Sequence, residues 1–191
     1  FCRLSLLKLD SKRCPSLPKT KMLNLLELLE QQLELVATWH QTEFAGSEAA
    51  DFATLVTRQH WANFALWHEE DKARDPRASD SQIAQVKRNI DKLNQQRNDL
   101  IERLDEALIH LLEARQQRNP DAPLNSETPG SIIDRLSINA LKIFHMDEEV
   151  QRPDASTEHR EKCSGKLSIL REQRHDLARS LQQLWDDLQS G

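Results

Sequence analysis

Apolar residues recur every three or four positions over five long stretches of the chain, a spacing that places them on one face of an α-helix. The expected helices run from about Leu23 to Phe44, Glu48 to Ala73 and Ser79 to Arg118, then onward from Pro129, and finally from Ser156 to Leu188. Most connections between them are short, and short connections make consecutive helices antiparallel neighbours. The pattern therefore predicts an all-α, up-down bundle of five main helices.

Residues that stop or cap helices stand between these stretches. Gly46 follows the first stretch and Pro76 the second, and Ser79 is a good N-cap for the third. Pro129 suits the first turn of the fourth helix. A polar linker over residues 119–127 separates the third helix from the fourth.

The sequence of the second and third helices resembles that of the fourth and fifth. A shift of 77 residues (135 − 58 = 77) aligns Arg58 to Leu108 with Arg135 to Trp185. The matched pairs include His68 with His145, Arg97 with Arg174 and Pro76 with Pro153. Any two amphipathic hairpins share leucines, but they do not share histidine, arginine and proline by default. We interpret the match as an internal duplication and expect two hairpins related by an approximate two-fold axis.

Composition narrows the kinds of partner to expect. The 191 residues are enough for one domain with a sizeable core. The net charge of −5 argues against a nucleic-acid binder, which usually presents a basic face. No apolar run is long enough to cross a membrane. We therefore expect a cytoplasmic protein that binds neither nucleic acid nor membrane.

The cysteines and the first residues lie outside any recognisable motif. Cys2, Cys14 and Cys163 have no CxxC spacing, so they predict neither a disulfide framework nor a zinc site, and Cys163 fits a small core position. Residues 1–21 are basic and broken by prolines, and we expect a disordered extension there, as an artefact of a misplaced start or, alternatively, a targeting arm. The single folded domain is then 22–191, beginning at Met22.

Three helices carry one polar motif on their apolar faces, an aromatic residue followed by His-x-x-acid. The motif occurs as Trp39-His40-x-x-Glu43, Trp67-His68-x-x-Asp71 and Phe144-His145-x-x-Glu148. A spacing of three residues places each histidine and its acid on one face of the helix. Arg97 and Arg174 also interrupt apolar faces, and buried charges need partners. We expect these polar residues to form two layers.

The first layer lies near the prolines that turn the hairpins and contains His68, Asp71, His145 and Glu148. Two histidines and two carboxylates could bind a divalent metal ion. Metal-binding bundles more often use the order Glu-x-x-His, so the pattern is a weak signal. The alternative is a set of buried histidine–carboxylate pairs that fixes the register of the helices.

The second layer is expected at the opposite end, where the first helix should finish. It contains His40, Glu43, Arg97 and Arg174, beside the start of the fourth helix at Ser131. Two arginines and a helix N-terminus are suited to a phosphate or carboxylate. The alternative is that Glu43 and nearby acids simply neutralise the arginines.

The remaining histidines, His60, His110, His159 and His175, carry no motif and are expected to be isolated and exposed. Phosphate-binding loops, nucleophile elbows and zinc-protease motifs are all missing from the sequence. No complete catalytic set is therefore recognisable, and the pattern favours a protein that is not an enzyme.

Three strings of residues resemble an uncharacterised bacterial family, domain of unknown function forty-two fifty-four. They are Leu66-Trp67-His68-Glu69-Glu70-Asp71-Lys72-Ala73-Arg74, Asn94-Gln95-Gln96-Arg97-Asn98-Asp99-Leu100-Ile101-Glu102 and the run from Asn125 to Ser137. The resemblance covers about Leu23 to Leu188. It implies a cytosolic, all-helical protein, with some members encoded near sugar-transferase genes, and it implies no particular activity or catalytic residues.

Three functions fit these observations. The first is a binding or assembly module for an anionic ligand, such as a phosphosugar or nucleotide-sugar, or for a protein partner. The second is a metal-dependent hydrolase acting on a phosphate-containing small molecule, by analogy with helical pyrophosphatases that use acids one turn apart. The third is a structural homodimer, with Trp185 and the last leucines supplying the interface.

Overall fold

The computed structural model describes residues 25–44, 46, 51–114, 122 and 124–190. Five α-helices make up this part of the chain: α1 (Leu25–Trp39), α2 (Phe52–Ala73), α3 (Asp80–Ala114), α4 (Pro129–Gln151) and α5 (Thr157–Ser190). These ranges contain no strand, so the predicted all-α fold is confirmed. Within them, no helix is long and apolar enough to span a membrane. The extension predicted over residues 1–21 and the start at Met22 lie outside the described residues.

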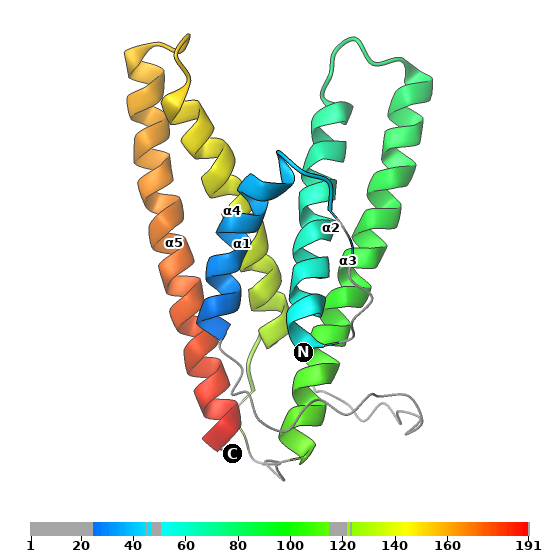
Figure 1. Ribbon diagram of the computed structural model, residues 1–191, viewed down its shortest axis with the longest axis vertical. Coiled ribbons are helices and arrows are strands. Elements are labelled where there is room, and N and C mark those ends of the chain that lie inside the picture. The colour runs from blue at the N-terminus through cyan, green and yellow to red at the C-terminus, as the bar shows by residue number, and fades with distance from the viewer. Residues whose placement is uncertain (1–24, 45, 47–50, 115–121, 123, 191) are drawn as a thin grey trace.

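The two predicted hairpins, α2–α3 and α4–α5, are confirmed. Figure 1 shows them side by side, close together at one end and diverging toward their turns. Corresponding helices begin 77 residues apart, since 52 + 77 = 129 and 80 + 77 = 157. The caps correspond as well: Asp51 accepts a hydrogen bond from the Thr54 amide, and Thr128 accepts one from the Ser131 amide. The helix bounds thus keep the register of the repeat, whose origin by duplication stays a prediction.

Helix α1 runs parallel to α2 and α4. The carbonyl of Gln32 contacts the His60 ring, and eight residues further along both helices the His40 ring contacts His68. The antiparallel direction expected for the first helix is therefore wrong. The reason is the length of the α1–α2 connection: residues 40–51 can span ~40 Å when extended, whereas α1 is only ~22 Å long.

The buried face of α1 also differs from the expected one. Leu29, Gln32, Val36 and Trp39 are buried, whereas the apolar Leu33 is 37% exposed. Gln32 is buried because α1 covers polar side chains of α2 and α5 as well as apolar ones. The apolar spacing of α1 alone could not indicate that partner.

The apolar core has two parts. The larger part lies where the hairpins are close together and contains Leu55, Leu104, Leu136, Leu181 and Trp185 among others. The smaller part lies nearer the turns, around Val36, Phe64 and Leu141. Trp185 is only 3% exposed, so it packs into the core and does not supply the surface that the homodimer hypothesis requires.

Candidate functional site

A buried carboxylate, Asp134 of α4, holds the first of the two arginines. The Nε and Nη2 atoms of Arg97 donate to its two oxygens at 2.8 and 2.6 Å. Gln59 and Asn63 of α2 also donate to Asp134 Oδ1, at 2.6 and 2.9 Å. The hydrogen bond from Arg97 to Asp134, and then the negative charge of Asp134, raise the pKa of Arg97. The charge of Arg97 is thus neutralised by an acid that the sequence pattern did not single out.

The second arginine, Arg174 of α5, is held by oxygens that carry no charge. It donates to the backbone carbonyl of Leu136 at 2.8 Å, to the carbonyl of Leu29 and to Gln32 Oε1. Burial lowers the pKa of Arg174 to about 10, so the side chain remains charged at neutral pH. Arg174 therefore fastens α5 to α1 and α4, and no contact among the described residues joins it to Arg97.

The N-terminus of α4 is occupied by groups of the protein itself. Asp105 Oδ1 of α3 accepts a hydrogen bond from the Gly130 amide at 2.7 Å, and burial raises the pKa of this carboxyl. Thr128 Oγ1 accepts from the Ser131 amide at 3.2 Å. A Cβ on Gly130 would lie 2.8 Å from both Asp105 Oδ1 and the Ile101 carbonyl oxygen. Glycine is therefore what allows α4 to approach α3 so closely.

The structure does not assemble the predicted anion layer. Arg97, Arg174 and Ser131 each have partners within the bundle, Glu43 is exposed, and His40 lies near the hairpin turns instead. The physical reason is the direction of α1, which carries His40 and Glu43 away from the arginines. Anion binding at these residues stays a prediction, and the arrangement of their side chains does not favour it.

His60 was expected to be isolated and exposed, and this is wrong because its ring is fully buried between α1, α2 and α4. Its Nε2–H donates to the Gln32 carbonyl at 2.9 Å, and its Nδ1 accepts from the Ser137 hydroxyl at 2.7 Å. Burial is the main reason that the pKa of His60 falls to about 4, so the ring is neutral. The sequence held one signal: Phe64 and His68 follow at intervals of four, on the same face of α2.

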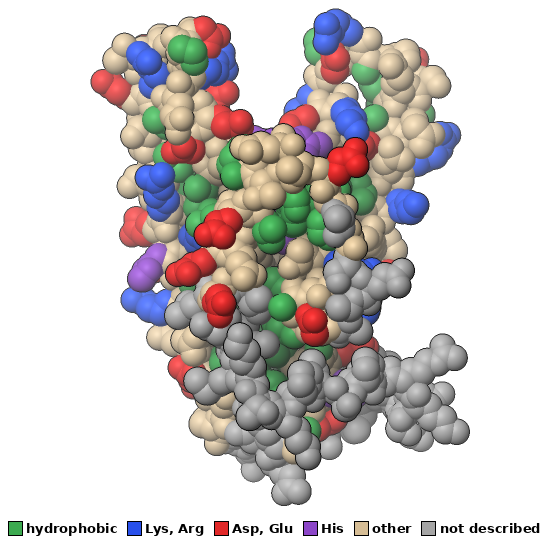
Figure 2. All heavy atoms as spheres, viewed as in Figure 1, with side chains coloured by type: hydrophobic (Ala, Val, Ile, Leu, Met, Phe, Trp, Pro, Cys, Tyr) green, Lys and Arg blue, Asp and Glu red, His purple; other side chains and the backbone are tan. Residues whose placement is uncertain are grey.

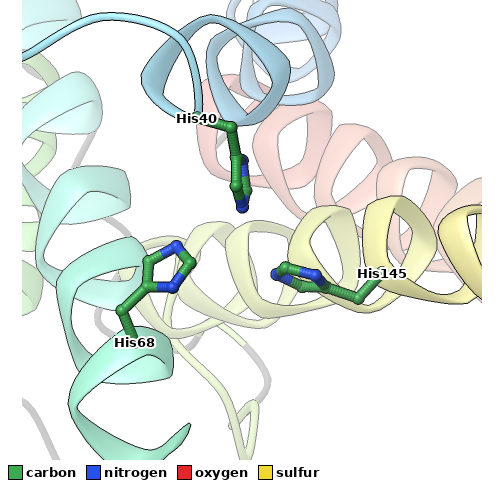
Figure 3. A group of neighbouring side chains, drawn as sticks. All are labelled: His40, His68 and His145. Atoms are coloured by element: carbon green, nitrogen blue, oxygen red, sulfur yellow. The ribbon is translucent and has the colours of Figure 1, made fainter. Parts of the chain in front are cut away.

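Three histidines, two of them on helices, meet near the divergence of the hairpins. His40 follows the last residue of α1, His68 lies on α2 and His145 on α4, and Figure 3 shows their rings pointing toward one another. One ring nitrogen of each lies within 4.8 Å of the others. This cluster contains two of the four residues predicted for a metal site, and His40 takes the place expected for a carboxylate.

Aromatic side chains fix the orientation of these three rings. Phe144 stacks on His40 with ring centroids 4.4 Å apart, and Trp67 stacks on His145 at 4.7 Å. Phe64 meets His68 edge to face at 4.5 Å. The aromatic residue of each His-x-x-acid motif therefore serves the cluster: Trp67 and Phe144 contact its histidines directly, and Trp39 packs against Phe64 behind them.

Hydrogen bonds decide which nitrogen of two rings is free. His40 Nδ1 lies 2.7 Å from the Val36 carbonyl and His145 Nδ1 lies 2.8 Å from Glu148 Oε2. A carbonyl or carboxylate oxygen only accepts, so in the neutral form of each ring Nδ1 carries the hydrogen and Nε2 has the lone pair. In the part of the chain that the structure describes, His145 Nε2 is buried and has no hydrogen-bond partner.

Of the two carboxylates predicted for the metal site, Glu148 contacts a histidine of the cluster and Asp71 does not. Glu148 supports His145 from behind, as described above. Asp71 does not join the cluster, because its carboxylate is half exposed and accepts from Arg74 at 2.9 Å. His68, which has no hydrogen bond among the described contacts, is kept neutral by its surroundings: burial first, then the nearby His40 and His145, lower its pKa.

The cluster is partly open to solvent, because His40 is exposed whereas His68 and His145 are half-buried. Figure 2 shows a hollow between the diverging hairpins, with histidine at its floor. Beyond Trp67, a separate pocket of about 220 Å³ lies between α2, α3 and α4, with Asn63, Arg74 and Arg97 among its lining residues. A small molecule can therefore approach the histidines through the hollow, and Trp67 borders both spaces.

The chain belongs to the family described as "Protein of unknown function (DUF4254)", which it matches over residues 53–191. The match begins at the first turn of α2 and includes both hairpins, so it contains His68 and His145 but not His40. No curated protein and no solved structure matches the chain. Family membership thus agrees with the resemblance found in the sequence and assigns no activity.

Proposed function

We propose that this protein binds a divalent transition-metal ion through His40, His68 and His145 and uses the ion for hydrolysis. The observation that carries the proposal is the meeting of three ring nitrogens within 4.8 Å, together with the buried and unpartnered Nε2 of His145. A buried polar atom without a partner is costly. A metal ion held between the rings would satisfy it.

The state of the rings supports the same reading. A metal ligand must be a neutral imidazole, and its other nitrogen typically donates to a carbonyl or carboxylate that fixes the ring. The pairs His40–Val36 and His145–Glu148 are arranged in this way. The pKa of His68 is lowered, which keeps its ring neutral near pH 7.

The donor set favours a catalytic type of site over a purely structural one. Three histidines leave a fourth position for water on Zn²⁺, and bound water then loses a proton near pH 7. Structural zinc sites use four protein ligands instead. The hollow above the cluster would admit an ester or phosphate ester to that position, and the described residues around it supply no competing nucleophile motif.

Metal content and affinity test the site directly. We expect the purified chain to bind Zn²⁺ or Co²⁺, and His68→Gln and His145→Gln each to lose one metal equivalent. His175→Gln, on the exposed face of α5, is the matched control and should bind as the natural chain does. Equal metal binding by His68→Gln and the control would refute the site.

Hydrolysis is tested separately with simple aryl esters and aryl phosphates. The metal-loaded protein should hydrolyse at least one of them faster than the chelator-treated protein, and His145→Gln should abolish the difference. If the metal-loaded and metal-free proteins have equal rates on every ester, the metal site is not hydrolytic.

A further inference from the structure

We propose that Glu149, His159 and Cys163 form a second metal site, for Zn²⁺ or a similar ion that accepts sulfur, at the turn of the α4–α5 hairpin. His159 Nε2 lies 2.8 Å from Glu149 Oε2 and 3.4 Å from Cys163 Sγ. All three ligand atoms lie within 4.8 Å of one another. Imidazole, thiolate and carboxylate are the three protein ligands that Zn²⁺ uses. This proposal does not depend on the three-histidine site.

The ends of two neighbouring helices position these ligands. His159 and Cys163 are four residues apart on α5, so they share a face one turn apart. Glu149 projects from the last turn of α4, across the short connection to α5. Cys163 is buried, and its thiol is directed to His159, so the ligands converge between the two helices. An ion there would join α4 to α5 near their turn.

The same three residue types can also form a nucleophilic triad, but the contacts here oppose that reading. In a triad the acid binds one ring nitrogen and the nucleophile the other. Here Glu149 and Cys163 both contact Nε2 of His159. A single nitrogen cannot donate its hydrogen to the carboxylate and also accept the thiol proton. Convergence of three donors on one point is instead what an ion requires.

Arg152 is the competitor for this site. Both Glu149 oxygens accept from Arg152 Nη1 at 3.1 Å, and Arg152 also donates to Asp154. The hydrogen bond from His159 and then that from Arg152 lower the pKa of Glu149, so the carboxylate is ionised at neutral pH. A metal ion would have to share Glu149 with this guanidinium. Removing the guanidinium should therefore strengthen metal binding.

The other hairpin provides an internal comparison. At a shift of 77 residues, the ligand positions correspond to Lys72, Gln82 and Val86 of α2–α3. None of these side chains is a usual zinc ligand. The site is therefore specific to one of two hairpins that are otherwise built alike.

Cobalt binding reports on this site alone, because a thiolate ligand gives Co²⁺ a charge-transfer absorption that histidines do not. The reference chain carries Cys2→Ser and Cys14→Ser, which leaves Cys163 as its only thiol. We expect the band to appear on adding Co²⁺, and Zn²⁺ to displace it. Cys163→Ser should abolish the band, His159→Gln should weaken Co²⁺ binding at least tenfold, and Arg152→Ala should tighten it several-fold.

Two outcomes would overturn the proposal. One is the absence of a thiolate band at millimolar Co²⁺ in the folded reference chain. The other is a band that persists with unchanged affinity in both His159→Gln and Glu149→Gln, which would show binding to the thiol alone. Both of those variants change exposed side chains, so circular dichroism should show them folded. His68→Gln, which alters only the three-histidine site, should leave the band unchanged.

Discussion

His60 is a neutral histidine at the centre of the bundle, and its two ring nitrogens are both paired with neutral oxygens. The Gln32 carbonyl accepts from one nitrogen and the Ser137 hydroxyl donates to the other. Protonation would place a hydrogen on Nδ1, which now accepts from the Ser137 hydroxyl. The oxygen of that hydroxyl already accepts a hydrogen bond from Asn63 at 2.9 Å. The ring is therefore an acid-sensitive point in the core.

Acidification should destabilise the fold through this residue. The folded pKa of about 4 lies below the ordinary histidine pKa of 6.5, so the unfolded chain binds the extra proton first. Stability should thus be full above pH 6.5 and fall by about 3 kcal/mol as the pH drops to 4. Urea unfolding at several pH values measures this. In His60→Gln the free energy of unfolding should change less with pH over that range, by the equivalent of about one proton taken up on unfolding. Parallel curves of unfolding free energy against pH for the two chains would contradict the assignment.

Glu148 is the residue that tests how the three-histidine cluster is supported. Glu148→Gln keeps an oxygen for the His145 Nδ1 hydrogen but removes its charge. Loss of a carboxylate behind a histidine ligand typically weakens metal binding 10–100-fold, and we expect a decrease of about that size. Zinc titration against a chromophoric chelator measures it. Glu161→Gln, on the exposed side of α5, is the control, and equal affinities in the two variants would exclude a supporting role.

The close packing of α4 on α3 depends on a single small residue, Gly130. Gly130→Ala would press a methyl group against the Ile101 carbonyl and the Asp105 carboxylate, and the backbone atom cannot move aside. We expect a loss of about 1–3 kcal/mol in the free energy of unfolding.

Gly165→Ala is the opposite case and the matched control. Nothing lies within 4 Å of a Cβ at this position inside α5. Alanine should stabilise the helix by about 0.5–1 kcal/mol, because glycine is a poor helix former. Denaturant unfolding of both variants checks the pair, and a Gly130→Ala chain as stable as the natural one would contradict the close packing of α4 on α3.

The sequence was sufficient to predict the helices because apolar spacing is a local property. The end of α2 and the start of α4 were predicted within a few residues. The sequence also predicted that His68 and His145 lie at the same height along the bundle, because each has the same distance along the chain from the proline that turns its hairpin. The direction of α1 was not predictable in this way, since residues 40–51 permit either direction. That one uncertainty moved His40 from the predicted anion site to the candidate metal site.

The remaining errors concern partners that come from other helices. Asp134 looks like an ordinary acid near the start of α4, and its burial is tolerable because Arg97 of α3 and two amides of α2 donate to it. His159 looks isolated until the hairpin turn brings Glu149 beside it. Such pairs depend on how helices are placed against one another, and spacing within one helix does not contain that information.

Across the whole molecule, packing is uneven from one end to the other. Most buried side chains lie where all five helices meet, and near the hairpin turns each helix packs mainly on its own partner. Local opening should therefore be easier at the turns. Hydrogen exchange should show the fastest helical amides near residues 70–85 and 150–160, and the slowest in Leu55–Phe64 and Leu100–Leu108. Uniform protection along α2 and α3 would contradict this gradient.

The parallel course of α1 has a mechanical consequence. The two hairpins contribute one histidine each to the cluster, and the third comes from α1, which the chain joins to them only through residues 40–51. An ion bound by all three would fix the C-terminal end of α1 against both hairpins. Ion binding would then add to the contacts that Arg174 and His60 already make with α1, so the metal-loaded protein should hold this helix more firmly than the metal-free protein.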